Sequence, residues 1–144
     1  MNIEHIKELR AFIAELPGDA CNMDTWFAPA HDEHNRSIPL TIMAERGFRC
    51  GAAACIGGWT QAMIALKNGL PDVIDECNGS AQGYLGLSYE ESERLFYEFP
   101  EPDEAPVSWK QWMLTRLDHI IETGEIDYWA DVAELHREFE EELP

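Results

Sequence analysis

The uncharged segment Ala52–Leu66 constrains the fold more than any other part of the sequence. It reads AAACIGGWTQAMIAL and consists of apolar and helix-tolerant residues throughout. Asn68 and Gly69 follow it, and a glycine after an apolar run is typical of a helix C-terminus. The sequence therefore predicts a buried central helix, with Cys55 inside it.

Two adjacent glycines, Gly57 and Gly58, fall within this predicted helix. Each glycine in a helix interior costs about 1 kcal/mol relative to alanine, because glycine loses more backbone freedom on folding. A close packing contact should offset that cost. We expect a second helix to approach across the glycine pair, with Trp59 packed beside it.

Apolar residues at spacings of three and four predict further helices on both sides of the central one. We expect helices over residues 3–16, 80–85, 89–99 and 109–124, and a last helix after Asp127. Ser88 with Glu91, and Ser108 with Gln111, have the capping-box spacing at two of the helix starts. Residues 71–77 indicate another short helix, whereas residues 40–46 fit a short helix or a strand.

Residues 19–37 and 100–106 show no sustained period and are expected to be loops. The second of these stretches contains three prolines, which regular helix does not tolerate. A chain of 144 residues, 45% of them hydrophobic, can bury one core. The expected fold is therefore all-α: a single domain over residues 1–144, built as a bundle of about six to seven helices around the central helix.

The start of the chain and its cysteines predict a cytoplasmic location. Residues 1–8 mix acidic and apolar side chains and lack the basic start and apolar stretch of a secretory signal. No stretch reaches 18 consecutive apolar residues, so no membrane partner is expected. Because disulfides are rare in the cytosol, the four cysteines are expected to be free thiols.

Acidic residues outnumber basic ones by 28 to 10, which gives a formal net charge of −18. This excess argues against direct binding to nucleic acid phosphates or anionic lipids. Residues 1–72 hold nine acids and six bases, whereas residues 73–144 hold 19 acids and four bases. The acids expected to form one face toward a partner are Glu90, Glu91, Glu98, Asp131, Glu134, Glu138, Glu141 and Glu142.

This acidic face has two interpretations. It can serve solubility alone, since runs of charge usually face solvent. It can also occupy the basic groove of a host protein, imitating the phosphates of nucleic acid and so inhibiting a nucleic-acid-binding enzyme. The second interpretation predicts a non-enzymatic binding protein, monomeric or homodimeric, that needs no cofactor.

Two other functions remain open from the sequence. His31, His34, Cys50 and Cys55 include the residue types of a tetrahedral zinc site, and Cys50 near a helix start could be a nucleophile. Either arrangement would give a small zinc- or thiol-dependent enzyme. Alternatively, aromatic side chains left on the surface would make the protein a homo-oligomer.

The segment CGAAACIGGW at residues 50–59 belongs to a longer pattern, with NMDTW at residues 22–26, AQGYLGLS at residues 81–88 and LF at residues 95–96. This pattern resembles a group of small uncharacterised proteins of bacteria and their phages. In that group, Cys-Gly-Thr-x-x-Cys-x-x-Gly is followed by an aromatic residue or His, and Leu-Gly-Leu by an acidic helix. The resemblance covers residues 20–130 and departs at Ala52, where the group has Thr. It implies an accessory protein of mobile elements. Small acidic proteins of that origin often bind and block a protein complex of the host.

Overall fold

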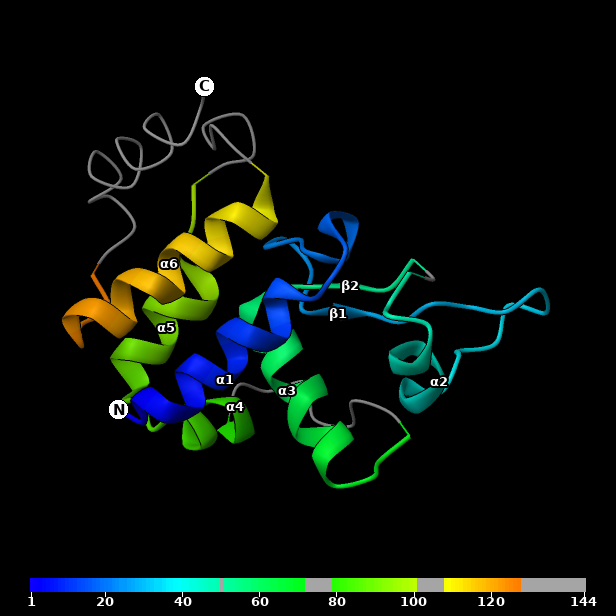
Figure 1. The fold of residues 1–144 in the computed structure, drawn as a ribbon, viewed down its shortest axis with the longest axis horizontal. Coiled ribbons are helices and arrows are strands. Elements are labelled where there is room, and N and C mark those ends of the chain that lie inside the picture. Colours follow the sequence, from blue (N-terminus) through cyan, green and yellow to red (C-terminus); the bar gives the residue numbers. More distant parts are fainter. Residues whose placement is uncertain (50, 72–78, 101–107, 128–144) are drawn as a thin grey trace.

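The computed structural model describes residues 1–49, 51–71, 79–100 and 108–127 of the chain. This part is mostly helical, as the sequence predicts (Figure 1). The helices are α1 (Ile3–Ala14), α2 (Leu40–Glu45), α3 (Ile56–Lys67), α4 (Gly79–Leu85), α5 (Tyr89–Tyr97) and α6 (Trp109–Thr123), with a short 3-10 helix at Gly18–Ala20. The loop predicted at residues 100–106, the helix predicted at 71–77 and the last helix after Asp127 lie almost entirely outside the described residues.

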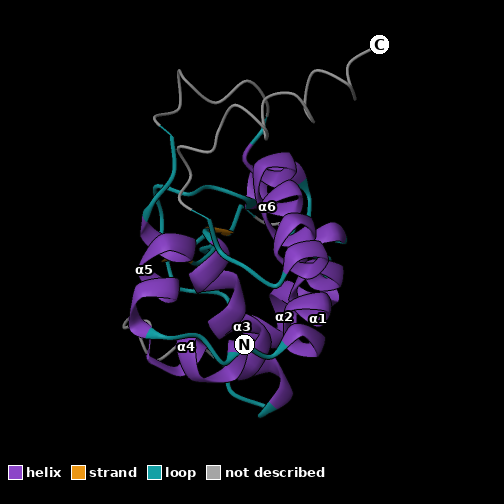
Figure 2. Ribbon diagram, turned by 90° about the vertical axis from the view of Figure 1, so that its left-hand side faces the viewer, coloured by secondary structure: helices purple, strands orange, loops and turns teal. Residues whose placement is uncertain are grey.

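Helix α3 is the central helix of the fold. It contacts α1, α2, α4 and α5, and in the view turned by 90° it lies between α5 and α1 (Figure 2). Helices α1 and α6 form an extended pair, while the shorter helices surround α3 from several directions (Figure 1). The predicted helical class is therefore confirmed, but the arrangement is less regular than a bundle.

The central helix begins later than the sequence predicts. Strand β2 (Ala53–Ala54) pairs antiparallel with strand β1 (Phe27–Ala28), and the helix starts only at Ile56. Cys55 is the N-cap of α3, and its Sγ accepts a hydrogen bond from the Gly58 N–H at 3.5 Å. The prediction that Cys55 lies inside the helix is wrong, because a strand partner distant in sequence fixes the preceding residues.

The glycine pair contacts the residue before β1, Trp26, and the ring of Phe96 instead of a second helix backbone. A β-carbon at position 58 would lie 1.5 Å from the carbonyl oxygen of Trp26, and one at position 57 would lie 2.3 Å from the Trp26 indole. The ring of Phe96, on α5, is also within 3.2 Å of that second position. Close approach across the glycines is thus present, but Trp26 supplies most of it, and the expected helix does not.

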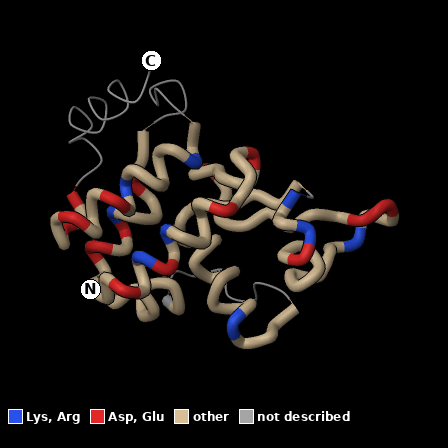
Figure 3. Tube along the Cα trace, viewed as in Figure 1, with Lys and Arg blue, Asp and Glu red and all other residues tan. Residues whose placement is uncertain are grey.

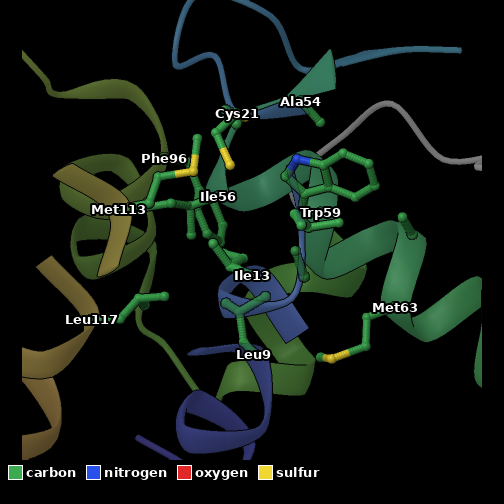
Figure 4. Close-up of a cluster of buried hydrophobic side chains, with 14 of the residues drawn as sticks. Leu9, Ile13, Cys21, Ala54, Ile56, Trp59, Met63, Phe96, Met113 and Leu117 are labelled. Atoms are coloured by element: carbon green, nitrogen blue, oxygen red, sulfur yellow. The ribbon is translucent and has the colours of Figure 1, made fainter. Parts of the chain in front are cut away.

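The hydrophobic core lies between α3 and the inward faces of α1, α5 and α6 (Figure 4). Trp59 is fully buried at its centre, with Phe12, Phe27 and Phe48 packed around the indole. The indole N–H donates to the carbonyl of Ala20 at 2.7 Å, so burial leaves no unpaired donor. Large rings around α3 therefore hold segments from across the chain together.

The predicted helix starts of α5 and α6 are confirmed. Ser88 Oγ accepts a hydrogen bond from the Glu91 N–H at 3.2 Å, and Glu91 Oε1 accepts one from the Ser88 N–H at 2.9 Å. Ser108 Oγ likewise accepts from the Gln111 N–H at 3.2 Å. These local side-chain contacts satisfy amide groups that a helix start otherwise leaves unpaired.

Candidate functional site: an acidic end built from three helix termini

Helices α1 and α6 run antiparallel, so the end of α6 lies beside the start of α1. Lys110, near the start of α6, donates to the carbonyls of Ala14 at 3.0 Å and Leu16 at 2.6 Å, at the far end of α1. Two turns further along α6, Asp118 pairs with Arg10 at 2.8 Å. Because the two helices run antiparallel, the last turn of α6 lies beside the first turn of α1.

The start of α5 lies at the same end of the molecule. The N–H of Asn2 donates to the carbonyl of Leu85, the last residue of α4, at 2.8 Å. Ser88 then caps α5. A short connection therefore brings the first turn of α5 next to the N-terminal turn of α1.

Exposed carboxylates gather where these three termini meet. Glu4 lies on α1, Glu90 on α5 and Glu122 on α6, while Glu125 follows α6. Figure 3 shows acidic residues concentrated at this end, near the label N. We call Glu4, Glu90, Glu122 and Glu125, together with the half-buried Glu91, the acidic end.

One nearby base, Lys7, forms an exposed ion pair with Glu4 at 3.4 Å, and two arginines donate to backbone carbonyls. Arg116 is 2% exposed and donates to the carbonyls of Arg94 and Asp127, and Arg94 donates to the carbonyl of Ile126 at 3.4 Å. Their guanidinium groups hold the segment after α6 against α5 and α6. Among the described residues, Glu90, Glu122 and Glu125 have no ion-pair partner.

The helix dipoles stabilise some carboxylates of the acidic end and destabilise others. Glu4, Glu90 and Glu91 lie in first turns, where the partial positive charge of free N–H groups favours a carboxylate. Glu122 lies in the last turn of α6, which holds no base, and Glu125 lies just beyond it. A carboxylate there faces unpaired carbonyls and costs a helix about 0.3–1 kcal/mol. Helix stability therefore does not account for Glu122 and Glu125.

The sequence-predicted acidic residues divide into three groups. Glu90 and Glu91 lie at the acidic end. Glu98 is the C-cap at the opposite end of α5, half-buried, and its Oε2 is buried without a hydrogen-bond partner in the described structure. The remaining predicted residues, Asp131, Glu134, Glu138, Glu141 and Glu142, lie outside the described residues.

Sequence reasoning missed Glu4, Glu122 and Glu125 as members of this surface. Their proximity depends on the antiparallel packing of α1 and α6, which local periodicity does not specify. One local signal was present: the last turn of the predicted helix ending at Gly124 contains Glu122 and no lysine or arginine. That pattern is opposite to the usual preference at helix C-termini.

The residues predicted for a zinc site are not brought together where the structure describes them. His31 and His34 are exposed on a turn closed by the His31–Ser37 bridge, whereas Cys55 is buried at the start of α3. Cys50 lies outside the described residues. In the described ranges, no three His, Cys, Asp or Glu side chains form a group that could hold a metal ion.

The buried thiols are also poorly suited to nucleophilic chemistry. Burial raises the pKa of the Cys55 thiol above its ordinary value, more than the N–H groups of Gly58 and Gly57 lower it. Burial likewise raises the pKa of Cys21 to about 11. Because the thiolate is the reactive form, both side chains are protonated and unreactive at neutral pH.

A polar cluster links α1, α3 and α4. The Tyr84 hydroxyl donates to Glu8 Oε1 at 2.8 Å and accepts a hydrogen bond from Lys67 Nζ at 2.7 Å, and Lys67 also pairs with Glu8. The Lys67 hydrogen bond lowers the pKa of Glu8, and the Glu8 hydrogen bond raises the pKa of Lys67. His5 stacks on the Tyr84 ring with centroids 4.0 Å apart. These mutual contacts indicate a cluster that joins three helices.

Comparisons with known proteins add no family or function to this geometry. Family models, curated proteins and solved structures give no match to the chain. Within the described ranges, every helix is too short or too polar to cross a bilayer. The acidic end is therefore identified by its own charge distribution and packing.

Proposed function

We propose that this protein is a non-enzymatic binding protein whose acidic end contacts a positively charged surface of a partner protein. The observation that carries the proposal is the position of Glu122 and Glu125. Both carboxylates oppose the dipole of α6, and neither has an ion-pair partner among the described residues. Solubility requires surface charge, but it does not require charge at a position that disfavours the helix.

The proposed partner is a host protein with a basic groove that ordinarily holds nucleic acid. Carboxylates spread over three helix termini could occupy positions that phosphates occupy in such a groove. The net charge of −18 disfavours nucleic acid itself as the ligand. The resemblance of residues 50–59 to bacterial and phage proteins supports a host target, and the proposed action is inhibition by occupancy.

A competition experiment tests this proposal. Tagged protein is incubated with host extract at low salt, and bound proteins are challenged with duplex DNA or RNA. We expect nucleic acid to release the partner, because both ligands compete for one groove. A partner that stays bound when nucleic acid fills its groove would contradict the mimicry.

Two charge variants locate the contact. The triple variant Glu4→Gln, Glu122→Gln, Glu125→Gln removes three charges from the acidic end. The control Asp24→Asn, Glu33→Gln, Glu45→Gln removes three charges from exposed acids elsewhere. We expect only the first variant to lose the partner at low salt. If both variants lose it equally, net charge and not the acidic end determines binding.

A further inference from the structure

A shallow apolar groove lies between α1 and α3, on the side of α1 that also carries Glu8. It encloses about 510 Å³ and is lined by Glu8, Ala11, Phe12, Met63, Leu66 and Lys67. Ala11 is exposed, and Phe12 and Leu66 are half-buried, so their apolar surface is open to a ligand. Helices α1 and α3 contact each other (Figure 1).

Carboxylates flank the groove along α1. Glu4, Glu8, Ala11 and Glu15 are spaced by four, three and four residues, which places them on one stripe of the helix. The apolar position Ala11 therefore has acids before and after it. On the α3 side, Lys67 is the charged lining residue, and it is paired with Glu8.

We propose that this groove binds a basic amphipathic helix of the partner. The inference rests on the proposed function and specifies which element of the partner binds. Apolar side chains on one face of that helix would cover Ala11, Phe12 and Leu66, while its lysines or arginines would pair with Glu4 and Glu15. The Met63 thioether side chain, at the floor, can adapt to apolar groups of different shape.

Charge complementarity selects this occupant over an acidic or neutral helix. The α1 rim has three carboxylates and one lysine, Lys7, which forms an exposed ion pair with Glu4. The rim and the chain as a whole, with its net charge of −18, are therefore acidic and would repel an acidic helix. Lys67 opposes a basic ligand locally, but its charge is compensated by the ion pair with Glu8. The basic residues of the partner are therefore assigned to Glu4 and Glu15.

Two synthetic peptides of equal composition test the groove. One is a Leu/Lys peptide of about 18 residues, or five helical turns, with its leucines on one face. The other is a scrambled version whose leucines share no face. Fluorescence anisotropy of labelled peptides at low salt should show binding about tenfold tighter for the amphipathic peptide, because only it presents an apolar face to the groove.

Ala11→Glu separates apolar contact from charge. The variant places a carboxylate in the middle of the groove. The added charge attracts any cationic peptide more strongly, but the side chain prevents the apolar face of a helical peptide from packing there. We expect it to weaken the amphipathic peptide about fivefold or more and leave the scrambled peptide unweakened. Thr41→Glu, at an exposed position of α2, is the matched control and should weaken neither.

The outcomes distinguish the groove from the acidic end. Equal affinity for both peptides, or the same response to Ala11→Glu and Thr41→Glu, overturns the groove inference. In that case, loss of binding in the Glu4, Glu122, Glu125 triple variant would still support the acidic end. Failure of both peptides to bind the wild-type protein at low salt would contradict the proposed function itself.

Discussion

The carbonyl oxygen of Trp26 packs directly on Gly58, where a β-carbon would lie 1.5 Å from that oxygen. The Cys55 N–H donates to the carbonyl of Thr25 at 2.7 Å, and the Cys55 thiol lies 3.8 Å from the Trp26 oxygen. The start of α3 is thus fixed to the segment before β1. Gly58 fills a place that no side chain can occupy without moving this backbone.

Gly58→Ala should destabilise the protein by about 3 kcal/mol or more, because backbone atoms must shift to admit the methyl group. Gly83→Ala is the matched control, since Gly83 lies in α4 and, among the described residues, no atom beyond its own helix turn comes within 4 Å of its β-carbon position. The control should raise stability by up to about 1 kcal/mol. Urea unfolding of both variants measures the difference, and similar effects would contradict the close packing.

Arg116→Met should lower the free energy of unfolding by about 2–4 kcal/mol. The substitution removes a buried guanidinium together with its hydrogen bonds to the carbonyls of Arg94 and Asp127. Arg10→Met is the control, because it breaks only the exposed pair with Asp118 and should cost about 1 kcal/mol or less. Thermal unfolding measures both variants. An equal loss of stability in the two would show that the buried guanidinium of Arg116 contributes no more than the exposed pair.

Stability should fall as the pH rises from about 9 to about 11, in part through Cys21. The unfolded thiol loses its proton near its ordinary pKa of 9.0, whereas burial holds the folded pKa at about 11. Between these values the unfolded state binds fewer protons, so unfolding is favoured by about 2–3 kcal/mol across the window. Cys21→Ala should flatten this part of the stability profile, and a profile as steep as that of the wild type would contradict it.

Neutralising acids at the two kinds of helix terminus should change stability in opposite directions. Glu122→Gln and Glu125→Gln remove carboxylates that oppose the α6 dipole and should each stabilise the protein by about 0.3–1 kcal/mol. Glu90→Gln removes a favourable charge from the first turn of α5 and should destabilise by a similar amount. Chemical denaturation at low ionic strength provides the comparison. Destabilisation by all three would remove the reason to assign Glu122 and Glu125 to binding.

Features that depend on neighbouring residues were predictable from the sequence. The capping box of Ser88 and Glu91 is local, and so are the Ser108 cap and the left-handed Gly124 that ends α6. The periodic apolar residues of α1 also predicted its start at Ile3, although the helix ends at Ala14, two residues before the predicted end.

Features that depend on distant segments were not predictable. Ala53–Ala54 have the composition of a helix, yet pairing with Phe27–Ala28 makes them a strand and leaves Cys55 as the cap. The candidate site shows the same division. Glu90 and Glu91 were identified from sequence, but Glu122 joins them only because α6 returns antiparallel along α1.

The most direct test of the acidic end is the salt dependence of binding to the captured partner. Association constants are measured over a range of salt concentrations for the wild type, the Glu4, Glu122, Glu125 triple variant and the Asp24, Glu33, Glu45 control. We expect the acidic-end variant to bind about tenfold more weakly at low salt, with a shallower salt dependence, and to approach the wild type at high salt. Affinity and salt dependence equal to those of the wild type would contradict the assignment of this surface to partner binding.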